Sequence, residues 1–87
     1  MLAHYFFDLR DGTVTPDKIG TELKSIDLAR NHAALAMGSL LAADPAKFWS
    51  GDEWEMTVRD AEGLTLFTIC IIGRDAAAIR SSSEGST

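Results

Sequence analysis

The chain has 87 residues, of which 46% are hydrophobic and 24% charged, and its formal net charge is −5. This length predicts one small domain whose core is marginal, so that association with a partner would stabilise it. The acidic balance disfavours nucleic acid as a partner, and no apolar run reaches the roughly 20 residues of a membrane-spanning helix.

The first predicted element is a strand over residues 3–9, which opens the chain with a cluster of three aromatic residues. Alternate residues of a strand face opposite sides, so Tyr5 and Phe7 share one face and Phe6 lies on the other. After a turn, residues 13–15 predict a short second strand that returns beside the first.

A long helix is predicted over residues 26–43, after an ordered loop over residues 17–23. Ser25 is suited to cap the helix because its hydroxyl can accept a backbone N–H of the first turn. Alanine and larger apolar residues recur at helical spacing and give the helix an apolar stripe. Asp44-Pro45 ends the helix, since the residue before proline is disfavoured in helical conformation, and residues 46–51 form a connection.

Two further strands, over residues 53–59 and 64–72, are predicted to form a hairpin around a turn that ends at Gly63. The first of them alternates strictly between apolar and polar residues, which is typical of a strand with one buried face. The second is apolar on both of its faces. Some apolar surface is therefore expected on a side of the sheet that one helix cannot cover.

The register of this last strand is open in the sequence. In one register, Thr68 and Cys70 face the core. In the other register, the inward residues are Phe67, Ile69 and Ile71, and their hydrophobicity favours this second arrangement.

Cys70 is the single cysteine of the chain, and its apolar neighbours predict a buried, unreactive thiol. One cysteine cannot form a disulfide within the chain, which fits a reducing compartment. The chain also begins without the basic and apolar regions of a secretory signal. We therefore expect a cytoplasmic protein that no membrane holds.

Together these elements predict an α+β fold of two layers. A three- or four-stranded, mainly antiparallel sheet packs on one helix, in the order β, short β, α, β, β. One domain is expected over residues 1–73. Residues 74–87 predict a polar C-terminal tail that is disordered at least from residue 81, because its Ser, Gly and Glu side chains have nothing to bury.

Several of these pieces occur in a recognisable order: the strand Tyr5-Phe6-Phe7, the turn Asp11-Gly12, the alanine-rich helix with Ala29-Arg30, and the hairpin from Trp54 to Gly63. In this order and spacing they resemble a family of short, single-domain bacterial proteins of unknown function, over roughly residues 4–72. The resemblance implies a shared fold in a cytoplasmic bacterial setting, and it brings no substrate, cofactor or catalytic residue. Ser25 stands where the family favours proline, and Asp8 where histidine is common.

The function that the sequence favours is a non-catalytic, homo-oligomeric protein-interaction module. A sheet covered by one helix leaves its other face bare, and monomers seldom expose a large apolar patch. A homodimer or another homo-oligomer would cover this patch, and neighbouring aromatic residues in the connection after the helix offer a second anchor. The candidate interface residues are Phe6, Leu66, Phe67, Ile69, Ile71, Phe48 and Trp49.

Two alternatives stay open. One is a small enzyme or ligand-binding protein whose segment over residues 8–22 holds a hard cation or small ligand through its acids, Asp8, Asp11, Asp17 and Glu22. The other is RNA binding through the aromatic sheet face around Phe6, which the acidic charge opposes. Catalytic triads, phosphate-binding loops and metal-ligand spacings are not recognisable, so no cofactor and no enzymatic activity are predicted.

Overall fold

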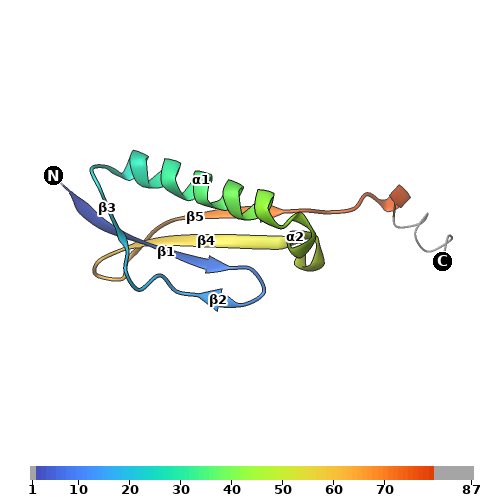
Figure 1. Cartoon of the computed structure of the whole chain (residues 1–87), viewed down its shortest axis with the longest axis horizontal. Helices are drawn as coiled ribbons and strands as arrows, with labels where there is room; N and C mark the ends of the chain where they lie inside the picture. Colours follow the sequence, from blue (N-terminus) through green and yellow to red (C-terminus); the bar gives the residue numbers. More distant parts are fainter. Residues whose placement is uncertain (1, 80–87) are drawn as a thin grey trace.

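The computed structural model describes residues 2–79 of the chain. It has two layers, with helix α1 (Ile26–Ala43) lying along one face of an antiparallel sheet (Figure 1). This arrangement confirms the predicted α+β fold. The disorder expected from residue 81 onwards lies outside the described residues. Within residues 2–79, the helices lack the combination of length and apolar character that a membrane crossing requires.

The sheet contains β1 (Ala3–Arg10), β2 (Val14–Thr15), β3 (Thr21–Leu23), β4 (Glu53–Asp60) and β5 (Thr65–Ile72). β1 and β4 are central, β5 forms one edge, and β2 and β3 both pair with the far side of β1. Every pairing is antiparallel. β3 lies in the segment predicted as an ordered loop. Its three residues are too few to produce an alternating pattern in the sequence, and pairing with β1 holds them extended.

The helix boundaries follow from side-chain caps. The Ser25 hydroxyl accepts a hydrogen bond from the Leu28 N–H at 3.2 Å, as predicted for the start of α1. Asp44 ends α1 and also begins a second helix, α2 (Pro45–Gly51), because its carboxylate accepts the Lys47 N–H at 3.2 Å. The expected connection is therefore a short helix, favoured by a proline at its first position.

The core lies between α1 and the two central strands. Ala29 and Ala33 are fully buried, and their small side chains let the helix backbone approach the sheet. Phe48, carried by α2, packs edge-on against Trp54 with ring centroids 5.5 Å apart and closes one end of the core. The buried residues are Tyr5, Ala29, Ala33, Met37, Phe48, Trp54, Met56 and Val58.

The register of β5 is the one that hydrophobicity favoured. Val58 pairs with Phe67, so Phe67, Ile69 and Ile71 lie on the helix side and pack against the core. A bulge between Val58 and Arg59 adjusts the pairing near the turn. The prediction that Cys70 is buried is wrong: it lies on the opposite face of the strand and is exposed.

Candidate functional site

The sheet face away from α1, here called the open face, is largely polar. It is built from alternate residues of β1, β4 and β5, because Tyr5 and Val58 on the same strands point into the core. Its members are His4, Phe6, Asp8 and Arg10 from β1, Glu53, Glu55, Thr57 and Arg59 from β4, and Thr68, Cys70 and Ile72 from β5. Charged side chains of β1 and β4 therefore occupy part of the face on which the sequence predicted an apolar patch.

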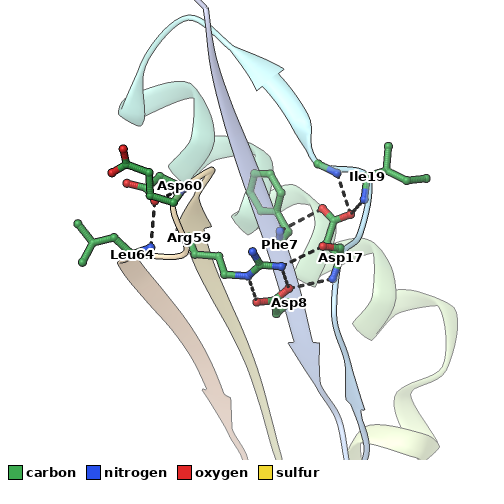
Figure 2. Close-up of polar contacts among 9 residues, drawn as sticks. Phe7, Asp8, Asp17, Ile19, Arg59, Asp60 and Leu64 are labelled. Atoms are coloured by element: carbon green, nitrogen blue, oxygen red, sulfur yellow. Dashed lines mark hydrogen bonds and ion pairs between the residues drawn. The ribbon is translucent and has the colours of Figure 1, made fainter.

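Arg59 is the centre of a polar network on the open face (Figure 2). Its Nε donates to Asp8 Oδ2 at 2.7 Å, and its Nη2 donates to Asp8 Oδ1 at 3.3 Å and to the Asp17 carbonyl at 3.0 Å. The guanidinium also lies over the ring of Phe6, 4.9 Å from the ring centroid. Phe6 is therefore half-buried beneath a charged group rather than fully exposed.

Asp17 closes a gap in the sheet edge between β2 and β3. Its carboxylate accepts the Phe7 N–H at 3.1 Å, where β1 has no strand partner on that side. The same carboxylate accepts the N–H groups of Ile19 at 3.1 Å and Gly20 at 3.0 Å, and the Asp17 N–H donates to Asp8 at 2.8 Å (Figure 2). Asp17 thus gives the Phe7 N–H the partner that an edge strand would otherwise supply.

The charges of this network are fixed by its hydrogen bonds. The bond from Arg59 is the main cause that lowers the pKa of Asp8 below its ordinary 3.8, and the same bond raises the pKa of Arg59. Burial would raise the pKa of Asp17, but hydrogen bonds from three backbone N–H groups outweigh it and lower the pKa. Both carboxylates are charged near neutral pH, so the network fastens the loop to the sheet instead of exchanging protons.

The free energy of unfolding is expected to fall as the pH drops from about 5, because Asp8, Asp11 and Asp17 bind protons more readily in the unfolded chain. The stability that these three carboxylates contribute is complete above their pKa in the unfolded chain. It is lost as the pH falls through their lowered pKa values in the folded protein. Urea titrations at stepped pH measure this slope. Asp17→Asn should flatten this slope, and a slope equal to that of the wild-type protein would contradict the assignment.

The structure separates the four acids of the predicted ligand loop. Asp8 and Asp17 lie together but share Arg59, whereas Asp11 pairs with Lys47 of α2 at 3.0 Å and Glu22 lies 3.8 Å from the His4 ring. Within residues 2–79, three or more His, Cys, Asp or Glu side chains do not gather anywhere in a way that would hold a metal ion. These carboxylates serve as anchors between neighbouring segments.

A shallow depression of about 320 Å³ lies at one end of the open face. Arg10 and Glu55 in its wall form an ion pair at 3.0 Å, and Glu55 also accepts a hydrogen bond from the Cys70 thiol at 3.5 Å. Partial desolvation of the thiol and this nearby carboxylate raise the pKa of Cys70, so the thiolate form is disfavoured. The basic side chain that lines the depression, Arg10, is thus already paired with Glu55.

The predicted interface residues do not form one patch. Phe48 is buried, and Trp49 beside it is 52% exposed with its ring edge-on to Phe48. Phe6 lies apart from them on β1, beneath Arg59, and the other candidates, Leu66, Phe67, Ile69 and Ile71, lie along β5. Leu66 is 37% exposed, and Ile72, which one of the two predicted registers places on the bare face with Leu66, is 51% exposed. The alternation of β5 places Ile72 on the same side as Cys70, a signal that the sequence contained.

The outer side of β5 is a free sheet edge within the described residues, since β5 pairs only with β4. Its eight residues, Thr-Leu-Phe-Thr-Ile-Cys-Ile-Ile, include no charged residue, proline or glycine. Alternate residues of such a strand present both N–H and C=O groups outward. This edge offers a template for pairing with another strand.

A family model described as a domain of unknown function, DUF6894, matches residues 4–72. The chain belongs to this family. The match agrees with the family resemblance carried by the strand, helix and hairpin pattern, and it gives the DUF6894 domain no activity. No curated protein and no solved structure matches the chain significantly. The match ends at Ile72, the last residue of β5, so the free edge lies inside the DUF6894 domain.

Proposed function

We propose that this protein is a non-catalytic interaction module of the bacterial cytoplasm that forms a homodimer through the free edge of β5. The observation that carries the proposal is the contrast between the two edges of the sheet: one edge is protected against pairing, and the other is not. The cytoplasmic placement is supported by the single cysteine, which cannot form a disulfide within the chain.

The protected edge is made by β2 and β3. These strands have two and three residues, and Pro16 and the Asp17 hydrogen bonds interrupt the edge between them. Short edge strands, prolines and charged side chains are the devices by which sheet proteins prevent unwanted strand pairing. This edge therefore cannot receive a further strand along its length.

The β5 edge lacks all of these devices. It runs for eight residues without a charge or a proline, and both of its faces are apolar. Phe67, Ile69 and Ile71 remain partly exposed on the helix side, while Leu66 and Ile72 are exposed. A second β5 would satisfy the outward backbone groups and place the apolar side chains of the two strands beside one another, where cross-strand pairs of this kind stabilise a sheet by about 0.2–1 kcal/mol each.

The alternative hypotheses receive less support. The acids over residues 8–22 have separate partners: three of them each lie beside a different basic side chain or ring, and the Asp17 carboxylate accepts backbone N–H groups. They therefore form no shared oxygen cage for a ligand. Phe6 lies beneath Arg59, and Glu53 and Glu55 on the same face would repel the phosphates of RNA. A second copy of β5 carries no charge and meets no such repulsion.

Light scattering after size exclusion, over a concentration series of the full chain, tests the proposal. We expect the mass of a dimer. Thr68→Lys should raise the dissociation constant at least about tenfold, because a lysine at the centre of the paired edges opposes pairing. Thr68 is exposed, so this variant should keep its fold.

The matched control is Thr15→Lys, which places the same charge on the protected edge. It should leave the dimer unchanged. A monomeric wild-type protein at every concentration would overturn the proposal. Equal weakening by both substitutions would show that charge alone, rather than the β5 edge, controls association.

A further inference from the structure

Two copies of β5 could pair in several registers, and the choice among them rests on the proposed function. We infer that the two strands run antiparallel about a two-fold axis at Ile69, perpendicular to the sheet, so that both α1 helices lie on the same side of one continuous sheet. The self-complementary pattern of β5 carries this inference.

In this register every residue from Leu66 to Ile72 meets a suitable neighbour. Antiparallel strands pair residues whose numbers have a constant sum, so Ile69 faces its own copy. Phe67 then faces Ile71 of the second copy on the helix side. On the open face, Thr68 faces Cys70 of the second copy. Aromatic and β-branched cross-strand pairs are the favourable unit of a sheet, and this register provides them in both copies.

The neighbouring registers match poorly. An axis at Thr68 places Ile71 opposite Thr65, and it moves Ile72 beyond the strand to the turn residue Leu64. An axis at Cys70 places Phe67 opposite Gly73, also outside the strand. Only the axis at Ile69 uses the strand from Leu66 to Ile72 while pairing large apolar residues with one another.

The direction of the axis follows from the two faces of β5. Phe67, Ile69 and Ile71 pack only partly against the core, because α1 lies over the central strands. With a perpendicular axis, these residues of both copies form one continuous apolar surface on the side of the sheet that carries the two α1 helices. An axis in the plane of the sheet would turn one copy over. Thr68 and Cys70 of that copy would then lie beside the apolar surface of the other copy.

The native Cys70 allows a direct test of this register. Directly opposed residues of antiparallel strands have Cα atoms about 4.5–5.5 Å apart, which falls within the range that a disulfide spans. The test compares wild-type protein, the double variant Thr68→Cys with Cys70→Ser, and an equimolar mixture of the two. After subunit exchange, each sample is treated with a mild oxidant and analysed on a non-reducing gel.

We expect a covalent dimer in the mixture and none in either protein alone, because position 68 of one copy meets position 70 of the other. The single variant Thr68→Cys, which keeps Cys70, should link by itself and serves as the positive control. Oxidation at a protein concentration far below the dissociation constant of the dimer measures how much disulfide forms through random collisions.

The other outcomes separate the inference from the proposed function. Linkage of the wild type alone would place the axis at Cys70, and linkage of the double variant alone would place it at Thr68; either result overturns the register. A dimeric mass without linkage in any sample would show that the copies associate in another geometry. A monomeric mass would overturn the proposed homodimer itself.

Discussion

Met37→Ala is expected to lower the free energy of unfolding by about 2–5 kcal/mol, because the side chain is fully enclosed between α1 and the sheet and its loss leaves a cavity. Domains of this kind have a total stability of about 5–15 kcal/mol, so a large share would be lost. Urea denaturation followed by tryptophan fluorescence measures the change, with the buried Trp54 as reporter.

Leu35→Ala is the matched control, since Leu35 lies on the same helix and is 73% exposed. Its effect should stay within about 0.5 kcal/mol. Both variants are compared with wild type at one protein concentration, because the stability of a dimer depends on concentration. A similar loss in both variants would mean that α1 packs on the sheet through a different face.

Elements with strong local signals were predictable from the sequence. The start and end of α1 depend on Ser25 and on the Asp44-Pro45 step, both of which act on the backbone immediately beside them. The strict alternation of β4 likewise predicts its buried face without knowledge of its neighbours. These boundaries agree with the structure because local and tertiary preferences coincide.

Two elements of the structure were not predicted, β3 because it lacks a local signal and α2 in spite of one. β3 is extended because β1 pairs with it, and its three residues carry no pattern of their own. For α2, a local signal was present: Asp44 followed by Pro45 is a favourable helix start. We interpreted that proline only as the end of α1, although the same residue pair serves both helices.

The candidate site required the tertiary structure. Asp8 and Arg59 are separated by 51 positions, so their ion pair depends on the register between β1 and β4. The apolar character of β5 was visible in the sequence, but its position at the edge was not, because strand order is set by long-range pairing. The apolar neighbours of Cys70 along β5 predict a buried thiol, but its exposure depends on which face of the strand it occupies, and it lies on the face away from α1.

Gly20→Ala is expected to lower the free energy of unfolding by about 2 kcal/mol or more, since two costs combine at this position. Gly20 has φ +77°, which side-chain-bearing residues rarely adopt. An added Cβ would also lie 2.7 Å from His4 Cδ2 and 2.8 Å from Phe6 Cε2. The rings would have to move, which would disturb the contact between Phe6 and Arg59. Urea denaturation measures the loss.

Gly63→Ala separates the two costs. Gly63 has φ +88° in the turn before β5, but no atom lies within 4 Å of the position that a Cβ would occupy. Its substitution should therefore carry only the backbone cost of about 1–2 kcal/mol. The excess destabilisation of Gly20→Ala over this control measures the contact with the two rings. If both variants lost the same stability, the rings would be free to move aside, and the open face would be less firmly ordered than its hydrogen bonds indicate.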